Sequence, residues 1–171
     1  MTETITHVAV RRINGFAKSD VFSALPNVKF SMDQRGCLVI DAPNVSSERV
    51  VTNDLVELHS SLSFMWLGRY DNIINSGGIK IRPEELESKL SAHLKVPFII
   101  ASEKDVELGE RVILVLESPT GAVPQDYSTA LSALLSFERP KKIYTLSQFP
   151  YTETGNILSL IHISEPTRRT P

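Results

Sequence analysis

The chain of 171 residues is 42% hydrophobic and 22% charged, a composition typical of a globular protein that buries an apolar core. Its formal net charge is -2 and its lysines and arginines are scattered, so we expect neither nucleic acid nor an anionic membrane as a partner. The sequence has no apolar run of about eighteen residues and no signal peptide at its start, which predicts a cytoplasmic protein.

The first part of the chain predicts a small β-rich subdomain. Residues 1–10 run from a polar start into a strand-like alternation, and loop-like breaks follow before short apolar runs resume. These runs predict strands over residues 28–31, 37–41 and 50–52. A later apolar run contains Trp66, which we expect to be a buried strand residue; the alternative is an aromatic platform for a ligand.

The single cysteine and the histidines do not indicate a metal centre. Cys37 alone excludes an internal disulfide and a thiolate cluster, and its apolar neighbours predict a small buried core residue rather than a nucleophile. His7, His59 and His93 show no metal-ligand spacing. We expect His93 to be a half-buried helix residue.

A hairpin and a helix are predicted near the middle of the chain. Two short apolar runs flank Ser76, Gly77 and Gly78, and a Gly-Gly pair between such runs suits a tight turn with positive φ. Pro83 fits the first position of a helix, because its missing N–H would be unpaired there, and two glutamates follow at the positive end of the helix dipole. The helix carries an apolar stripe formed by Leu86, Leu90 and Leu94.

The rest of the chain alternates strands and helices. Residues 97–102 and 112–117 predict strands, residues 127–137 an amphipathic helix, and residues 143–146 a last strand. We therefore expect an α+β protein, in which a β-rich part is followed by a small domain whose sheet is backed by helices.

The amino-acid sequence of residues 68–87 identifies a protein family more specifically than the hairpin and helix that it predicts. It reads Gly-Arg-Tyr-Asp-Asn-Ile-Ile-Asn-Ser-Gly-Gly-Ile-Lys-Ile-Arg-Pro-Glu-Glu-Leu-Glu and closely resembles the hinge motif of the adenylate-forming acyl-CoA synthetases, or AMP-binding enzymes. The resemblance implies that a carboxylate is activated with ATP and Mg²⁺ to an acyl-AMP, which then transfers its acyl group to coenzyme A. Asp71 matches the hinge residue between a large N-terminal and a small C-terminal domain.

The same resemblance assigns further residues of this motif. Arg69 matches an arginine that reaches the ribose and phosphate side of the nucleotide, a task that suits an always-charged guanidinium; the alternative is a domain-interface ion pair. Ser76, Gly77, Gly78 and Lys80 match the pantetheine tunnel of coenzyme A, where glycines permit close approach.

Two upstream segments resemble other nucleotide motifs of the family. The start, Met-Thr-Glu-Thr, resembles the end of the motif Tyr-Gly-Met-Thr-Glu-Thr, which implies that Thr2 contacts the α-phosphate and Glu3 holds magnesium. Because this motif lies inside the large domain, we expect Met1 to be an internal methionine and the chain to be a fragment. The segment Thr52-Asn53-Asp54 resembles the motif Thr-Gly-Asp, whose aspartate bonds the ribose hydroxyls; Asn53 replaces the glycine, and asparagine tolerates a left-handed backbone.

The last family motif departs from its pattern at the catalytic position. Residues 148–157 resemble Leu-Pro-x-Thr-x-x-Gly-Lys-Ile, and Thr152 and Gly155 fit, but Asn156 stands where the family has the catalytic lysine. An amide cannot carry the positive charge, and losing such a donor costs on the order of a hundred- to a thousandfold in rate. The substitution counts against adenylation, while thioester formation does not use this lysine.

Lys141 and Lys142 could meet a phosphate of coenzyme A, although a solvated surface pair is expected.

Residues 158–171 resemble the translation of a sequencing adapter, and we expect a non-native tail there. A sequencing error at the adjoining Asn156 is therefore an alternative to a real substitution. The domain prediction assigns residues 1–68 to the C-terminal part of the large AMP-binding domain, 69–71 to the hinge and 72–157 to the C-terminal domain.

Within the family the chain looks most like the o-succinylbenzoate-CoA ligases of menaquinone biosynthesis, through stretches such as Cys-Leu-Val-Ile-Asp-Ala-Pro and Asn-Ile-Ile-Asn-Ser-Gly-Gly-Ile-Lys-Ile. The sequence contains no glycine-rich phosphate loop, so we expect this fragment alone to be inactive. Two alternatives stay open: a non-catalytic module that binds coenzyme A or a partner, and an adenylate-forming ligase whose acceptor is a carrier protein.

Overall fold

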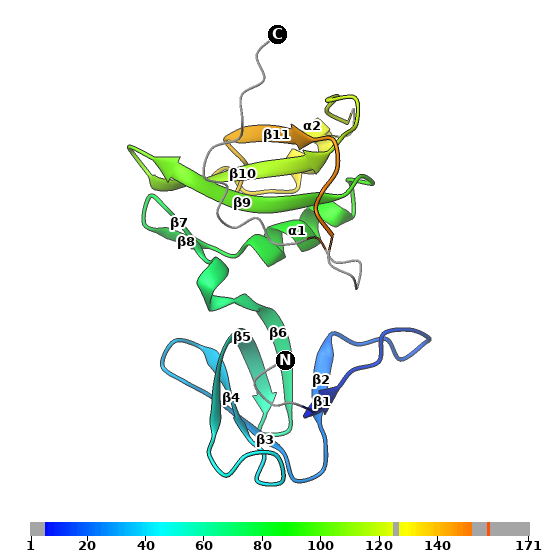
Figure 1. The fold of residues 1–171 in the computed structure, drawn as a ribbon, viewed down its shortest axis with the longest axis vertical. Coiled ribbons are helices and arrows are strands. Elements are labelled where there is room, and N and C mark those ends of the chain that lie inside the picture. The colour runs from blue at the N-terminus through cyan, green and yellow to red at the C-terminus, as the bar shows by residue number, and fades with distance from the viewer. Residues whose placement is uncertain (1–5, 125–126, 152–156, 158–171) are drawn as a thin grey trace. The chain divides into compact units, whose positions relative to one another are not determined.

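The structure is a computed structural model that describes residues 6–124, 127–151 and 157. The chain divides into two compact units, Met1–Asp71 (unit 1) and Asn72–Pro171 (unit 2), each with its own β-sheet (Figure 1). Strands predominate and the helices are few and short, which confirms the predicted α+β class.

Unit 1 is a six-stranded antiparallel sheet with the order β1-β2-β6-β5-β4-β3. Its strands are β1 (Ala9–Val10), β2 (Val21–Ala24), β3 (Lys29–Met32), β4 (Cys37–Asp41), β5 (Val50–Ser60) and β6 (Ser63–Arg69). Strand β5 is much longer than the predicted 50–52, because Thr52 and Asp54 occupy buried positions where the sequence pattern expects apolar residues.

The core of unit 1 is apolar and contains an aromatic group at its centre. The Phe64 ring stacks on Phe22 with the ring centres 5.2 Å apart and makes an edge contact with Phe30 at 4.9 Å. Cys37 is completely buried next to this core, as predicted, and burial raises the pKa of its thiol. A raised pKa disfavours the thiolate, which is the reactive form.

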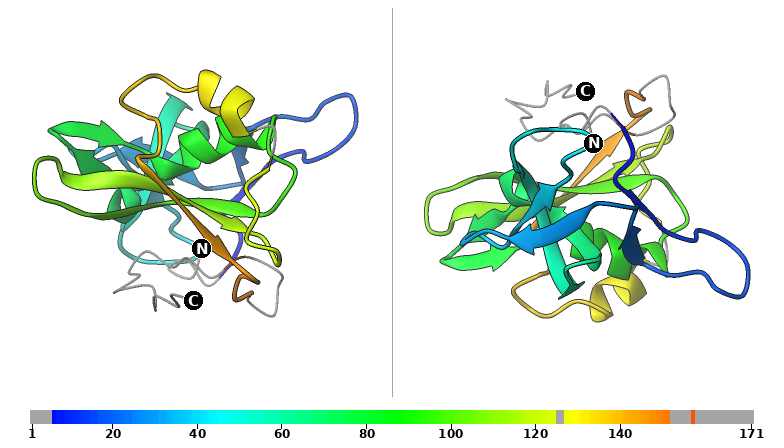
Figure 2. Two further views of the ribbon diagram at one scale, coloured as in Figure 1. Left: turned by 90° about the horizontal axis from the view of Figure 1, so that it is seen from above. Right: turned by 90° about the horizontal axis from the view of Figure 1, so that it is seen from below.

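Unit 2 contains a five-stranded sheet with the order β11-β10-β7-β8, in which β9 also pairs with β10. Its strands are β7 (Ile74–Ser76), β8 (Ile79–Ile81), β9 (Phe98–Asp105), β10 (Gly109–Glu117) and β11 (Lys142–Leu146), and only the pair β10–β11 is parallel. The helices α1 (Pro83–Ser91) and α2 (Tyr127–Ser132) lie together over one face of this sheet (Figure 2).

The two faces of strand β10 bury two separate apolar clusters. Val112, Leu114 and Leu116 face the helices and pack with Leu86 and Leu90 of α1. The alternate residues Ile113 and Val115 pack with Phe149 on the opposite face. This two-sided burial follows from the period of two along a strand and explains the nearly continuous apolar run of the sequence.

The second predicted helix is shorter than expected. It ends at Ser132 rather than at residue 137, and Leu135, which lies within the predicted range, is 58% exposed. The buried Glu138 carboxylate accepts the Leu135 N–H at 2.9 Å and the Lys89 ammonium at 2.8 Å. These bonds hold a turn in place of further helix.

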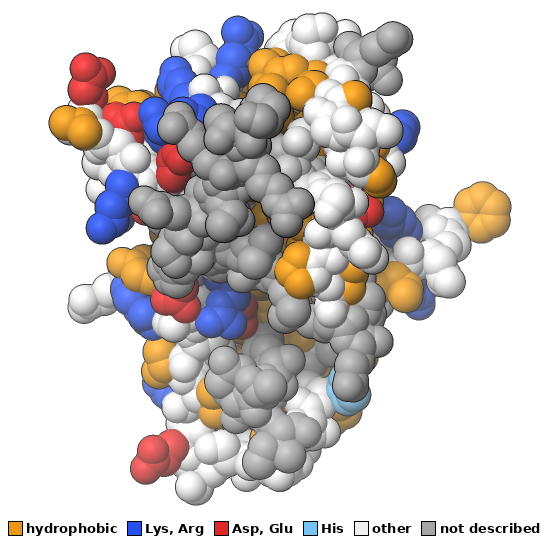
Figure 3. Space-filling model, turned by 45° about the horizontal axis from the view of Figure 1, so that its top comes forward, with side chains coloured by type: hydrophobic (Ala, Val, Ile, Leu, Met, Phe, Trp, Pro, Cys, Tyr) orange, Lys and Arg blue, Asp and Glu red, His pale blue; other side chains and the backbone are white. Residues whose placement is uncertain are grey.

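Lys and Arg side chains on the face shown in Figure 3 are interspersed with Asp and Glu rather than gathered in one patch. Within the described residues, no helix is long and apolar enough to cross a membrane.

Candidate functional site

Thr2, Glu3, Thr152, Gly155 and Asn156 lie outside the described residues. The described candidates fall into two groups: a polar cluster in unit 1, formed by Arg35, Asn53, Asp54, Arg69 and Asp71, and the β7–β8 hairpin with its surroundings in unit 2.

The polar cluster is built on the pairing of β5 with β6. Asp54 and Arg69 are direct partners across these strands, and the Arg69 Nη1 atom lies 4.0 Å from Asp54 Oδ1. The Asp54 side chain is 9% exposed, so its charge is held close to this guanidinium. Strand pairing thus brings together two residues that are well separated in the sequence.

Trp66 joins this cluster but is not the buried residue that was predicted. It is 40% exposed, and its indole Nε1–H donates to Asp54 Oδ1 at 3.2 Å. A bulge between Leu55 and Val56 shifts the register of β5 against β6, and bulges re-aim side chains. The polar end of the indole is therefore satisfied by Asp54 while much of the residue stays accessible.

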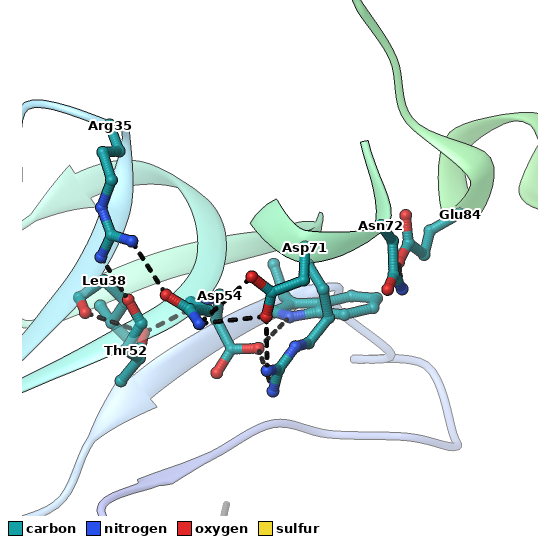
Figure 4. Close-up of polar contacts among 10 residues, drawn as sticks. Arg35, Leu38, Thr52, Asp54, Asp71, Asn72 and Glu84 are labelled. Carbon is teal, nitrogen blue, oxygen red and sulfur yellow. Dashed lines mark hydrogen bonds and ion pairs between the residues drawn. The ribbon is translucent and has the colours of Figure 1, made fainter. Parts of the chain in front are cut away.

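Asp71 lies in a one-turn 3-10 helix, η1 (Tyr70–Asn72), that directly follows β6. Its Oδ2 atom accepts the Asn53 Nδ2–H at 3.0 Å and the Arg69 Nη2–H at 3.2 Å (Figure 4). The Arg69 guanidinium consequently bridges Asp54 and Asp71, which sit in the same unit.

Asn53 does not adopt the left-handed backbone that the comparison with glycine suggested. Among the described residues other than glycine, only Asn27 has a positive φ, and Asn53 lies inside β5. The Thr52 hydroxyl fixes this part of the strand, because it donates to the Leu38 carbonyl at 2.8 Å and accepts the Asp54 N–H at 3.1 Å. Asn53 therefore continues strand β5 and needs no left-handed backbone.

Arg35 is a member of the cluster that the sequence did not reveal. Its guanidinium donates to Asn53 Oδ1 at 2.9 Å and to the Thr52 carbonyl at 3.1 Å, and it lies over the Tyr70 ring at 5.2 Å. The Asp33 carboxylate forms an ion pair with the same guanidinium, with 2.9 Å between Asp33 Oδ2 and Arg35 Nε. The Cys37 backbone N–H and then the Arg35 side chain lower the pKa of Asp33, which keeps this carboxylate charged.

In unit 2 the predicted hairpin is confirmed. Strands β7 and β8 pair antiparallel, and Gly77 and Gly78 have φ angles of 60° and 84°. The Gly77 N–H donates to the Leu108 carbonyl at 2.8 Å, and a Cβ atom on Gly77 would come within 3.1 Å of the Leu108 side chain. Gly77 is thus required both by its backbone conformation and by a close approach.

The helix after the hairpin also begins as predicted, with Pro83 at its first turn. Beside it lies a pocket of about 270 Å³, lined by Ile73, Lys80, Ile81, Arg82, Glu85, Leu86, Phe137 and Glu138. Arg82 pairs with Glu85, which also pairs with Lys89 at 3.1 Å. Lys80 is exposed at the pocket and makes no ion pair with the described residues.

Other predicted residues of unit 2 occupy ordinary structural positions. His93 is half-buried, as expected, but it follows the end of α1 rather than belonging to it. Lys141 and Lys142 are exposed, and the Lys142 ammonium lies 3.2 Å from Glu103. In the described part of the chain, no group of three or more His, Cys, Asp or Glu side chains could hold a metal ion.

Comparisons with known proteins identify relatives of this chain. No family model matches the chain. A salicylyl-CoA synthase / salicylate adenylyltransferase of Streptomyces sp. is 33% identical over 111 residues, which are 62% of this chain and 20% of the relative. The 4-chlorobenzoate–CoA ligase of Arthrobacter sp. is 26% identical over 148 residues, covering 75% of this chain and 28% of the relative. The chain thus spans less than a third of either curated relative.

A solved structure shares the fold. The o-succinylbenzoate coenzyme A synthetase (MenE) from Bacillus subtilis, in complex with ATP and a magnesium ion, superposes with a TM-score of 0.68 at 21% identity. The similarity covers 92% of this chain and 38% of that chain.

Proposed function

We propose that this chain is part of an acid–CoA ligase. Its relatives and structural neighbours support the acyl-CoA synthetase family of AMP-binding ligases. The whole enzyme would activate a carboxylate with ATP and Mg²⁺ to an acyl-AMP, releasing pyrophosphate. The thiol of coenzyme A would then attack the acyl carbon and release AMP. In this proposal residues 1–68 end the large AMP-binding domain, 69–71 form the hinge, 72–157 are the C-terminal domain and 158–171 are a non-native tail.

The observation that carries the proposal is the cluster of Asp54, Arg69 and Asp71. A carboxylate accepts hydrogen bonds from two neighbouring hydroxyls, which suits Asp54 to the ribose of a nucleotide. The guanidinium of Arg69 suits the nearby phosphate, because it keeps its charge and offers donors in a planar fork. Thr2 and Glu3 would contact the α-phosphate and magnesium.

The second half-reaction would use the hairpin of unit 2. The positive φ angle of Gly78 and the open space where its side chain would lie leave the backbone there accessible to a narrow ligand such as the pantetheine arm, while Gly77 shapes the turn against Leu108. Ser76 and Lys80 flank the same turn and would contact this arm. Rotation about Asp71 would exchange this hairpin with the final motif at the active site, a movement known as domain alternation.

The finer proposal for the acyl substrate is o-succinylbenzoate. Support comes from the quoted sequence stretches, which resemble those of the o-succinylbenzoate-CoA ligases. Salicylate and 4-chlorobenzoate, which appear in the names of the two curated relatives, are the natural competitors in an assay. All three are aromatic carboxylates.

Pyrophosphate release tests the proposal. The 171-residue chain alone should release none from ATP with any of the three acids, since the sequence holds no phosphate loop. In the complete protein we expect release with o-succinylbenzoate and an acyl-CoA product detected by mass spectrometry. Asp71→Pro should uncouple the two half-reactions, and finding both unchanged would refute the hinge.

Asn156 favours the second candidate, a non-catalytic module that binds coenzyme A or a partner. The variant Asn156→Lys separates the candidates in the complete protein. If the enzyme has lost only its catalytic charge, the adenylation rate should rise by about a hundred- to a thousandfold. A module without an active site would gain nothing. Replacing coenzyme A by a phosphopantetheinyl carrier protein tests the third candidate, a different acceptor.

A further inference from the structure

The two residues at the boundary of the units are each tied to their own unit by a side chain. Asp71, the last residue of unit 1, accepts hydrogen bonds from Asn53 and Arg69. Asn72, the first residue of unit 2, donates its Nδ2–H to Glu84 Oε1 at 2.7 Å (Figure 4). The bonds between their two Cα atoms lie within the single turn η1, and neither set of side-chain contacts crosses them.

We propose that Asn53 and Glu84 are positioning residues that confine the swivel of the hinge to the link between Asp71 and Asn72. The inference rests on the proposed function for the role of the hinge, and on the contacts within each unit for everything else. It concerns bond rotations at one link and does not depend on which acid or acceptor the enzyme uses.

The chemistry of Asn53 suits it to a relay. Arg35 offers only donors and the Asp71 carboxylate only acceptors, so a side chain between them must accept on one side and donate on the other. The Asn53 amide does so, with Oδ1 at 2.9 Å from Arg35 Nη1 and Nδ2 at 3.0 Å from Asp71 Oδ2. Asn53 stands where the resembling family motif has glycine, which has no side chain for this task.

The relay ends on a fixed support. Arg35 is held by Asp33, by the Thr52 carbonyl and by the Tyr70 ring. Asp33 in turn accepts the backbone N–H groups of Arg35 and Cys37 at 2.8 and 2.9 Å. Because each member makes several contacts, Asn53 cannot turn away from Asp71 without breaking other bonds.

The support on the other side is the first turn of α1. Glu84 belongs to this helix, whose Leu86 and Leu90 are buried in the core of unit 2. The Asn72 side chain is therefore fixed to a packed helix rather than to a loop. With both flanks anchored, a rotation that opens the single turn η1 is concentrated in ψ of Asp71 and φ of Asn72.

Backbone amide exchange and ¹⁵N relaxation of the full 171-residue chain test this inference without any ligand. Asn53→Gly removes the relay, and Asn53→Asp keeps an acceptor for Arg35 but removes the donor to Asp71. A hydrogen bond of this kind is worth about 1 kcal/mol, so we expect amides 70–72 to exchange about fivefold faster in both variants. Glu84→Ala should have a comparable effect at Asn72 and Ile73.

Two matched controls make the result specific. Glu84→Gln retains an acceptor oxygen for Asn72 and should restore wild-type exchange. Arg49→Gln removes the exposed ion pair with Asp41, 3.6 Å long, and should leave amides 70–73 unchanged. Core amides of β5 and β6 report global unfolding in each sample.

The inference is overturned if amides 70–73 exchange at the wild-type rate in all three disruptive variants, or if core amides accelerate equally. These outcomes are independent of the ligase proposal, which is refuted if the complete protein releases no pyrophosphate. A complete enzyme that is active but has unaltered hinge exchange in Asn53→Gly would keep the function and reject the relay.

Discussion

The two candidate sites differ in what holds them. In unit 1 the cluster depends on side chains, because Asn53, Asp54, Arg69 and Asp71 are placed by hydrogen bonds and an ion pair. In unit 2 the hairpin depends on backbone conformation and on the apolar core beneath it, since Ile74 and Ile81 pack in the same cluster as α1. Conservative polar substitutions should therefore damage the first site, and changes of volume or φ the second.

Leu90→Ala should have the largest effect, because Leu90 is fully buried between α1 and the sheet. Truncating such a side chain costs about 3 kcal/mol through lost apolar burial and a residual cavity. Urea denaturation followed by amide exchange should show the loss in unit 2, including its hairpin. Leu135→Ala, at a position that is 58% exposed, is the matched control and should cost less than about 0.5 kcal/mol.

Glu87→Gln should make the stability of unit 2 less dependent on pH. Burial, together with the nearby Glu84 charge, raises the pKa of Glu87 to about 7, although the Ile100 N–H that it accepts opposes the shift. Because the folded pKa exceeds the ordinary 4.5, the carboxyl supports folding fully below pH 4.5 and loses this contribution as the pH rises through 7.

The glutamine variant should thus gain about 3 kcal/mol over wild type at pH 8 and nothing at pH 4, while its amide oxygen still accepts the Ile100 N–H. Thermal unfolding across this pH range measures the difference. A gain of equal size at both pH values would mean that burial of charge is not its cause. Glu107→Gln, on an exposed turn, is the control.

Two single variants, Gly77→Ala and Gly78→Ala, test the backbone requirement of the hairpin. Both positions have positive φ, which costs an alanine about 1 kcal/mol. Only at Gly77 would the new Cβ also come within 3.1 Å of Leu108, whereas at Gly78 it would meet nothing within 4 Å. Chemical denaturation should show a larger loss for Gly77→Ala; equal losses would mean that the close approach is relieved easily.

The comparison of the two units also explains what the sequence could predict. The hairpin and α1 were predictable because Gly77, Gly78 and Pro83 impose local geometry. Such geometry depends on residues that are adjacent in the sequence. Strand β4 was predicted at its exact bounds for the same reason, since an uninterrupted apolar run is flanked by turn residues.

The rest depends on partners that are distant in the sequence. Arg35 reaches Asn53 across 18 residues, and only the pairing of β4 with β5 brings the two together. Trp66 was expected inside because its apolar ring dominates a sequence pattern, but the Asp54 carboxylate offers its N–H a partner at the surface. The early end of α2 likewise depends on Glu138 and on Lys89 from another helix.

The proposed nucleotide site is tested most directly with the only tryptophan of the chain, whose indole N–H donates to Asp54. The 171-residue chain is titrated with AMP while the indole N–H resonance of Trp66 is followed by NMR, in wild type and in Asp54→Asn. A ribose bound at Asp54 should shift this resonance saturably, and loss of the carboxylate should weaken the apparent affinity by about tenfold, since hydrogen bonds to a charged group are worth about 1.5 kcal/mol or more. No shift with AMP, or the same titration in Asp54→Asn, would contradict the claim that this cluster is a nucleotide site.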